Sequence, residues 1–257
     1  MLANYHTHTV RCQHASGEDK AYVEAAIKSG MKILGFSDHC PWIYDDGHVS
    51  GTRMLPSQLD DYFASMDRLK REYKNDITIY AGFEAEYIPE LIEKQYRLLD
   101  NYPVDYMILG QHFTGREPFA PYTGFPSDSE YELKKYVDTI IMGMDTGRYS
   151  YVAHPDLFNF TGTDDIYRKH MGRLCEYLKE RNIPIEINML GLLQGRHYPA
   201  DKFFRIAAET GCDAIIGCDA HFPESLNDTE NMEKCRMYAE RFGLKLVDFL
   251  PGLGIKE

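Results

Sequence analysis

Short apolar runs alternate with segments of helical periodicity along most of the chain. The runs are rich in Ile, Leu, Val, Tyr and Phe, as is typical of strands buried in a sheet. We expect strands at residues 2–6, 32–36, 78–83, 106–110, 149–153, 184–188 and 214–217, with 244–247 as a short last one. Helical spacing of apolar residues predicts helices at residues 18–29, 56–73, 88–99, 127–144, 164–181, 201–210 and 228–242.

Strand and helix units in regular succession indicate a parallel sheet, because parallel neighbours need a helical crossover between them. With 257 residues and 44% hydrophobic composition, the chain can bury the core of one α/β barrel or of two small domains. No internal segment is rich enough in Pro, Gly and Ser to act as a linker. We therefore expect a single domain over residues 1–257, an α/β barrel whose functional site lies in the loops after the strands.

The formal net charge of −12, from 28 Lys and Arg against 40 Asp and Glu, bears on the partner. Nucleic-acid binding needs clustered basic residues, so this charge argues against a nucleic-acid partner. The charge is compatible with a small anionic substrate if metal cations supply positive charge inside the site.

The six cysteines form no CxxC motif and no compact disulfide pattern. We expect them to be reduced thiols, mostly buried, as in a cytoplasmic protein. No apolar run approaches the ~18 residues of a membrane span, and His6 follows the first Met too closely for a signal peptide to precede it. The expectation is a cytoplasmic protein with no membrane partner.

Histidines and carboxylates follow the predicted strands. In His6-Thr7-His8, after the first strand, the two imidazoles lie two residues apart and point to the same side of the chain. Asp219-Ala220-His221, after the strand at 214–217, repeats this spacing with a carboxylate and an imidazole. Either pair alone is unremarkable in a chain with 10 histidines, but both pairs at strand ends of one barrel predict a metal site.

Two further candidates have a neighbour that could take their place. His39 follows Asp38, and either residue could be the ligand, of which we favour His39. Glu84 and Glu86 lie on the same side of a predicted strand. We assign the metal to Glu84, as a carboxylate that bridges two cations, and expect Glu86 to be a supporting or solvated residue.

His112 and His154 also follow strands, although for either one alone a core or loop histidine explains the pattern equally well. Asp156 could orient an imidazole, as carboxylates beside metal ligands do. Eight candidate ligands therefore follow strands: His6, His8, His39, Glu84, His112, His154, Asp219 and His221. His14, in the loop after the first strand, is the ninth, and it enters the set through the family resemblance described below.

Nine nitrogen and oxygen ligands are too many for one ion and suffice for three, each with an open position for water or substrate. A set without thiolates suits Zn²⁺, Mn²⁺ or Fe²⁺. Ligands delivered by successive strand ends are typical of a metal-dependent hydrolase. Pairs of such ions, ~4 Å apart, activate water and stabilise the entering and leaving oxygens of phosphoryl transfer.

Taken together, these segments resemble the polymerase and histidinol phosphatase (PHP) family. The matching motifs are His6-Thr7-His8-Thr9, His14, Ser37-Asp38-His39, Gly82-Phe83-Glu84, Gly110-Gln111-His112, Ala153-His154-Pro155 and Cys218-Asp219-Ala220-His221. The stretch from Glu186-Ile187-Asn188 to Gly191-Leu192, followed by Tyr198-Pro199, is similar to the histidinol-phosphatase branch. The match runs from residue 6 to about residue 224, nearly the whole chain.

The resemblance implies a distorted (β/α)₇ TIM-like barrel that holds three divalent metal ions. It places His6, His8, Glu84 and Asp219 around the first ion. Glu84, His112 and His154 would hold the second ion, and His14, His39 and His221 the third.

The chain departs from the family pattern at two points. The histidinol-phosphatase branch often has Arg directly after Gly-Leu, where this chain has Leu193, so a phosphate-binding arginine has moved to Arg196 or been lost. Cys218 stands where Ser usually precedes Asp-Ala-His, a change that a residue outside the ligand set tolerates.

The activity implied by the resemblance is that of a phosphoric monoester hydrolase: a histidinol-phosphatase of histidine biosynthesis, which converts L-histidinol phosphate to L-histidinol and phosphate. The partner is then a small-molecule phosphate ester. We assign catalysis to Glu84, Asp219 and His221. Loop residues beyond strand ends are the candidates for substrate binding: Arg53, Arg116, Arg196 and His197.

Three alternatives stay open at this point. The chain could be a PHP phosphoesterase that acts on another small phosphate ester or a nucleotide. It could be a deacetylase or deaminase of the amidohydrolase type, although that class does not account for His14, His39 and His221 together. It could also be a metal-binding or regulatory protein without catalytic activity on the same fold.

Overall fold

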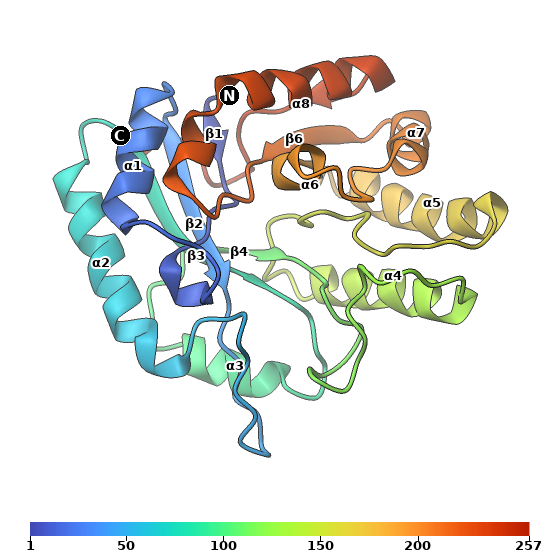
Figure 1. Cartoon of the computed structure of the whole chain (residues 1–257), viewed down its shortest axis with the longest axis horizontal. Coiled ribbons are helices and arrows are strands. Elements are labelled where there is room, and N and C mark those ends of the chain that lie inside the picture. Colours follow the sequence, from blue (N-terminus) through green and yellow to red (C-terminus); the bar gives the residue numbers. More distant parts are fainter. Residues whose placement is uncertain (257) are drawn as a thin grey trace.

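The structure is a computed structural model that describes residues 1–256. Two parallel sheets form its centre, and helices cover their outer faces (Figure 1). The first sheet contains, in order, β1 (Ala3–Asn4), β2 (Ile33–His39), β3 (Thr78–Ala85) and β4 (Tyr106–Leu109). The second contains β5 (Ile185–Asn188), β6 (Asp213–Gly217) and β7 (Lys245–Leu246).

Single residue pairs join the two sheets at both edges and close them into a barrel. Val152 pairs in parallel with Leu109 at the end of β4 and with Ile185 at the start of β5. At the other edge Thr7, just after β1, pairs in parallel with Ala220, just after β6. The predicted strand at 149–153 therefore takes part in the ring as a single bridged position, and the expectation of a distorted (β/α)₇ TIM-like barrel in one domain is confirmed for the fold.

Each expected helix is present, with ends that differ by a few residues. The helices are α1 (Asp19–Lys28), α2 (Leu59–Glu72), α3 (Ile92–Leu99), α4 (Glu130–Asp145), α5 (Asp164–Glu180), α7 (Asp201–Thr210) and α8 (Thr229–Phe242). The sequence pattern did not predict the short α6 (Met189–Leu193), because its residues form one apolar run without helical periodicity. Three 3-10 turns complete the elements: η1 (Val10–Cys12), η2 (Pro56–Gln58) and η3 (Pro223–Asn227).

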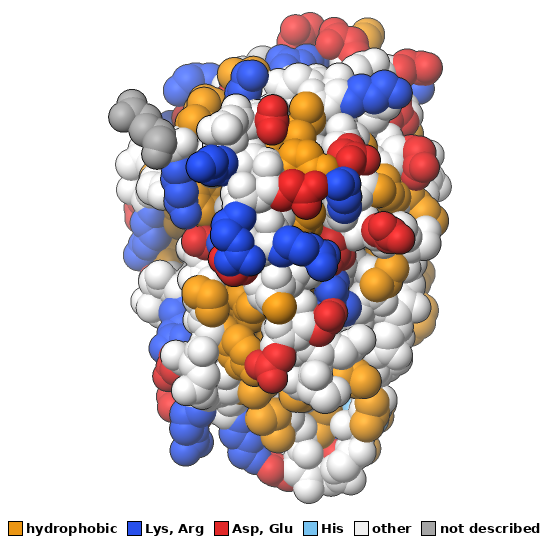
Figure 2. All heavy atoms as spheres, turned by 90° about the vertical axis from the view of Figure 1, so that its left-hand side faces the viewer, with side chains coloured by type: hydrophobic (Ala, Val, Ile, Leu, Met, Phe, Trp, Pro, Cys, Tyr) orange, Lys and Arg blue, Asp and Glu red, His pale blue; other side chains and the backbone are white. Residues whose placement is uncertain are grey.

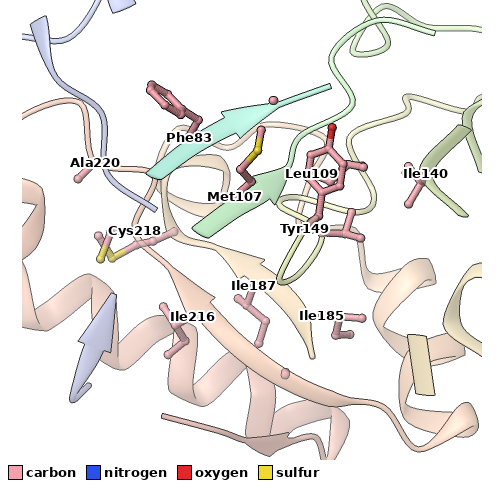
Figure 3. Packing of buried hydrophobic residues seen from close by; sticks show 14 of the residues in the cluster. Phe83, Met107, Leu109, Ile140, Tyr149, Ile185, Ile187, Ile216, Cys218 and Ala220 are labelled. Carbon is pink, nitrogen blue, oxygen red and sulfur yellow. The ribbon is translucent and has the colours of Figure 1, made fainter. Parts of the chain in front are cut away.

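Side chains alternate between the barrel interior and the helix layer, because successive residues of a strand face opposite sides. On β3, Tyr80 belongs to the interior cluster, whereas Phe83 packs in the helix layer. Figure 3 shows part of this helix layer, in which four strands contribute Phe83, Met107, Ile187 and Ile216. Continued alternation along β3 places Glu84 on the interior face.

The interior is apolar at the N-terminal ends of the strands. Four buried tyrosines fill it: Tyr5, Tyr80, Tyr106 and Tyr151. The hydroxyl of Tyr5 donates to the carbonyl of Leu253 at 2.6 Å, and that of Tyr80 to the carbonyl of Gly254 at 2.6 Å. Leu250 and Leu253 pack in the same cluster, so the C-terminal segment closes this end of the barrel.

Charged side chains are mixed on the outer surface. On the face that Figure 2 shows, toward α1 and α2, Lys and Arg side chains are interspersed with Asp and Glu side chains. Ion pairs on these helices include Lys20 with Glu72 at 2.6 Å and Lys70 with Asp105 at 2.6 Å. This face therefore carries no continuous basic stripe.

Two further expectations concern the cysteines and the membrane. All six cysteines are buried and free, as the sequence predicts. Among the helices of residues 1–256, none has both the length and the apolar composition needed to cross a membrane.

We expect the C-terminal segment around Leu250 and Leu253, which plugs this end of the barrel, to contribute to stability. Leu250 is 2% exposed inside the barrel, so Leu250→Ala should lower the free energy of unfolding by about 2–4 kcal/mol through lost apolar contacts and a cavity. Urea denaturation measures this difference. The matched control is Ile255→Ala, at a side chain that is 56% exposed, which should change the free energy by less than about 0.5 kcal/mol. Equal effects of the two substitutions would contradict the plug.

Candidate metal centre

The structure brings all nine candidate ligands together at the C-terminal ends of the strands. Neighbouring imidazole rings lie close: the centroids of His8 and His221 are 4.2 Å apart, and those of His112 and His154 are 5.0 Å apart. His14 reaches the same cluster from the loop after η1, with its ring centroid 4.7 Å from that of His221. Residues from both halves of the chain therefore form one site.

Glu84 lies at the middle of this cluster, and its two carboxylate oxygens face different histidines. Oε2 lies 3.5 Å from His6 Nε2 and 3.6 Å from His8 Nε2. Oε1 lies 2.8 Å from His154 Nε2 and 3.5 Å from His112 Nε2. A carboxylate shared in this way can bridge two cations.

Asp219 completes the group around His6 and His8. Its Oδ1 lies 3.1 Å from His8 Nε2 and 3.6 Å from His6 Nε2. Asp219 and His154 both adopt a positive φ, 49° and 31°, a conformation that is costly for residues other than glycine. Hydrogen bonds hold both in place: Asn188 Nδ2 donates to Asp219 Oδ2 at 3.2 Å, and the backbone N–H of His154 donates to Glu186 at 2.7 Å.

A third group lies beside the first two. The ring nitrogens of His14, His39 and His221 include one from each residue that lie within 4.8 Å of one another. His39 also belongs to the neighbourhood of Glu84, since its Nδ1 is 3.2 Å from Glu84 Oε2. The separation between the first and third groups is therefore less sharp than the sequence resemblance implies.

Unpartnered buried atoms test whether metal ions fit here. Among residues 1–256, His6 Nε2, both ring nitrogens of His8, both carboxylate oxygens of Glu84 and His221 Nε2 are buried without a hydrogen-bond partner. Buried polar atoms are normally satisfied, because each unsatisfied one costs free energy. These atoms converge on common points, and imidazole with carboxylate is the donor set of Zn²⁺, Mn²⁺ or Fe²⁺ sites. The residues present therefore fit a divalent metal centre.

Hydrogen bonds to the other ring nitrogen orient several of the imidazoles. His6 Nδ1 lies 2.8 Å from Glu186, and His112 Nδ1 lies 3.0 Å from Glu86. The Nδ1 atoms of His14 and His221 lie 2.7 and 3.0 Å from backbone carbonyls, which can only accept. Donation from Nδ1 leaves the Nε2 lone pair directed at the cluster, as metal ligands require.

Two expectations about carboxylates can be compared with these contacts. Glu86 is fully buried and its carboxylate contacts Nδ1 of His112, as expected of a residue that supports a candidate ligand. The alternative, that Glu86 is solvated, is wrong. The sequence suggested that Asp156 orients an imidazole. In the described structure it instead accepts a hydrogen bond from the backbone N–H of Ala200 at 2.6 Å. The carboxylate that was expected to orient an imidazole therefore binds the backbone of the segment between α6 and α7.

The electrostatics of the cluster favour ionised carboxylates. Burial disfavours the charged form of Glu84, but the charges on His112 and His6 outweigh burial and hold its pKa well below the ordinary value. For Asp219, burial is likewise outweighed, chiefly by the charge on His6 and by the close imidazole of His8, and its pKa is also well below the ordinary value. Both candidate ligands are therefore anionic at neutral pH.

The histidines divide into two kinds. Burial, with the charge on His8, lowers the pKa of His221 to about 3 and that of His39 well below its ordinary value, so both imidazoles are neutral. Burial also opposes the charge on His6 and His8, but neighbouring carboxylates, Glu186 first for His6 and Asp219 first for His8, raise their pKa values. A metal ion bound at these two residues would take the place of the proton.

A cavity of about 520 Å³ opens onto the centre. Its wall away from the metal ligands is largely aromatic and apolar, with one exposed cation. The residues of this wall are Thr52, Arg53, Phe113, Tyr122, Leu190, Gln194, Arg196, Tyr198 and Phe222. The volume suits a small molecule with one end on the cluster.

The four candidates for substrate binding lie in different places. Arg196 lines the cavity, and its Nη1 donates to the Tyr198 hydroxyl at 2.5 Å. Arg53 also lines the cavity, but its guanidinium is bound to the buried carboxylate of Glu86 and to the partly buried carboxylate of Glu117. Arg116 pairs with Asp46, and neither it nor His197, which bonds to a backbone carbonyl, is among the described residues that line the cavity.

Several functional residues were missed by the sequence reasoning. Glu186 contacts His6, the backbone of His154 and Asn188, yet only the Glu-Ile-Asn motif of the family resemblance marked it. Its alternation with the apolar residues of β5 was the available signal, since a Glu on the interior face of a barrel strand needs polar partners. Tyr122 and Gln194 lie in loops without periodicity, so nothing in the pattern placed them in the cavity.

Comparisons with known proteins agree with the geometry. Residues 4–190 match the family model described as PHP domain. A probable histidinol-phosphatase of Deinococcus radiodurans is 27% identical over 234 residues, 86% of this chain and 87% of that protein. A histidinol-phosphatase of Bacillus subtilis is 24% identical, over 84% of this chain and 92% of that protein.

The fold is also similar to that of a solved structure. The crystal structure of histidinol phosphate phosphatase from Lactococcus lactis, complexed with zinc, L-histidinol and phosphate, aligns with a TM-score of 0.74 at 18% identity. The alignment covers 100% of this chain and 99% of that chain. At this identity the similarity concerns the fold.

Gly110 offers a test of the central place of Glu84. A Cβ at Gly110 would overlap Glu84 Oε1, so Gly110→Ala should displace the carboxylate and weaken metal binding at least about tenfold. The measurement is metal content per chain after equilibration with a metal buffer. The control is Gly172→Ala in α5, where the new Cβ meets its nearest neighbour, Ile206, at 3.9 Å and should leave metal content unchanged. Equal metal content in both variants would count against this role of Glu84.

Proposed function

This chain belongs to the PHP domain family, and on that premise we propose that it is a metal-dependent histidinol-phosphatase, which hydrolyses L-histidinol phosphate to L-histidinol and phosphate. The observation that carries the proposal is the position of Glu84, whose two oxygens face different histidines below an open cavity. Relatives over most of the chain's length that are named histidinol-phosphatase support the choice of substrate.

The proposed centre holds three divalent ions. His6, His8 and Asp219 offer donor atoms within 4.8 Å of one another, and Glu84 Oε2 joins them at the first ion. Glu84 Oε1 joins His112 and His154 at the second. His14, His39 and His221 form the third set. Zinc, manganese and iron all suit these donors.

When bound, such ions supply Lewis acidity, which makes water a nucleophile at neutral pH and neutralises charge on the phosphoryl oxygens. The residues of this chain provide the rest. Glu84 and Asp219, as anions, would hold the cations together with the neutral imidazoles of His39 and His221. His221 thereby takes part in catalysis as a ligand.

We assign phosphate binding on the protein side to Arg196. Its hydrogen-bond partners in the described structure, the Tyr198 hydroxyl at 2.5 Å and the Gln194 side chain at 2.8 Å, are both neutral. Its positive charge is therefore uncompensated beside the cavity and is available to a phosphate dianion. Arg116 and His197 are not among the described residues that line the cavity, so we do not assign phosphate binding to them.

The aromatic wall suits the alcohol part of the substrate. The aromatic rings of Phe113 and Tyr122 line the cavity, and the ring of Tyr122 lies nearly parallel to that of His112, with centroids 6.5 Å apart. An imidazole ring carried by the substrate can pack against such faces. The amide of Gln194 offers both a donor and an acceptor to ring nitrogens.

Phosphate release from a panel of substrates tests the proposal. We expect metal-loaded protein to hydrolyse L-histidinol phosphate with kcat/KM at least about 100-fold above that for mononucleotides or a generic aryl phosphate. Glu84→Ala, shown to be folded by circular dichroism, controls for contaminating phosphatases and should be inactive. Turnover of the aryl phosphate without turnover of histidinol phosphate would remove the specific assignment and leave a phosphatase of another substrate. Absence of turnover on the whole panel would favour a metal-binding protein without catalytic activity.

A further inference from the structure

Arg53 is an unusual cavity arginine because its charge is already compensated. Its side chain is 4% exposed, and its two Nη atoms donate to the two carboxylate oxygens of Glu86 at 2.6 and 2.8 Å. Its Nε donates to Glu117 Oε2 at 3.1 Å. Two carboxylates thus face one guanidinium, and the local formal charge is negative. A phosphate dianion would meet repulsion here, in contrast to Arg196.

Glu86 connects this arginine to the centre. Glu86 is fully buried, and its Oε1 accepts from His112 Nδ1 at 3.0 Å. The same imidazole presents Nε2 to Glu84 Oε1 at 3.5 Å. The orientation of the His112 ring therefore depends on the position of the Glu86 carboxylate. The forked contact from Arg53 holds that carboxylate more closely than its other side-chain donor, Trp42 Nε1 at 3.4 Å.

Glu117 extends the connection to two loops that flank the cavity. Arg53 lies near the end of the loop between β2 and η2, whereas Glu117 belongs to the loop after β4. Glu117 also accepts from the Ser50 hydroxyl at 3.0 Å, and the Gln13 side chain donates to the carbonyls of Ser50 and Arg53 at 2.9 and 2.7 Å. These contacts fix the position of Arg53 beside Gln13, which immediately precedes His14.

We propose that Arg53 is a positioning residue, which fixes His112 through Glu86 and thereby sets metal occupancy on that side of Glu84, and that it is not a phosphate ligand. The inference deepens the proposed function and rests on it for the metal at His112 and His154. Lys cannot replace Arg here without loss, because a single ammonium group cannot make the forked contact with Glu86 and also reach Glu117.

Metal titration of Arg53→Met and of the milder Arg53→Lys tests this role. We expect the metal concentration for half-maximal activity to rise about 10–100-fold in Arg53→Met and less in Arg53→Lys. After equilibration in a zinc buffer, Arg53→Met should hold about one ion per chain fewer than the wild type. At saturating metal, the KM for the phosphate ester should return to within about threefold of the wild-type value. Glu86→Gln, which keeps an acceptor but loses the charge, should shift the metal midpoint in the same direction.

Two control variants separate the alternatives. Arg173→Met removes the ion pair of Arg173 with Asp138 between α4 and α5, and should leave the metal midpoint unchanged. Arg196→Met should raise KM at least about tenfold at all metal concentrations and leave metal content unchanged, as expected for a phosphate ligand.

The Arg53 inference would be overturned if Arg53→Met and Arg53→Lys retained the wild-type metal content and midpoint. A KM raised at least about tenfold that excess metal did not restore would also overturn it, because that result identifies a phosphate ligand. If Arg53→Met does not fold, the metal content and midpoint of Arg53→Lys and Glu86→Gln test the role of Arg53 in its place. If the wild-type protein binds no metal, the proposed function itself is contradicted. If the wild type binds metal and the Arg53 variants bind the same amount with the same midpoint, only the role of Arg53 is contradicted.

Discussion

The buried carboxylate of Glu84 is the constraint on which the rest of the site depends. It is 1% exposed, lies between imidazoles on both sides and has no hydrogen-bond partner among the described residues. An uncompensated buried anion costs several kcal/mol, on the order of the whole stability of a domain. Histidines can compensate it only as cations, which cannot bind metal, whereas divalent ions compensate it and satisfy the free ring nitrogens together.

The barrel makes room for this carboxylate through its neighbours. In the register of β2 and β3, His39 lies opposite Glu84, so strand pairing alone brings two ligands side by side. On the other side Gly110 leaves the space that Glu84 Oε1 occupies, and Gly217 does the same for Glu186. The interior thus changes from tyrosines at one end to carboxylates and imidazoles at the other, and the apolar end, closed by Leu250 and Leu253, supports the polar one.

Much of this arrangement could be predicted from the sequence because it depends on strand ends. Apolar runs located the strands, and parallel strands deliver the residues after them to one end of a barrel, so His6, Glu84 and Asp219 were expected to meet. His14 lies in a loop, and only the family resemblance indicated its place. Strand alternation predicts that Glu86 and Glu186 face the interior, but it does not predict their hydrogen-bond partners.

The parts that could not be predicted depend on contacts between loops. Arg53 was expected to bind phosphate because it lies beyond a strand end. Its actual partners, Glu86 and Glu117, lie 33 and 64 residues away along the chain, and no periodicity reports such a contact. Likewise Asp156 is engaged by the backbone of Ala200, from a segment whose course around α6 the pattern did not reveal. Charge compensation inside a site is decided by tertiary structure, so an arginine near a cavity is not identified as a ligand by position alone.

Anomalous X-ray scattering from crystals of the zinc-loaded protein would show directly whether Glu84 bridges two metal ions. We expect metal peaks on both sides of Glu84, one beside His6, His8 and Asp219 and one beside His112 and His154, with Glu84 bound to both. A single peak, or peaks that Glu84 does not contact, would contradict this expectation.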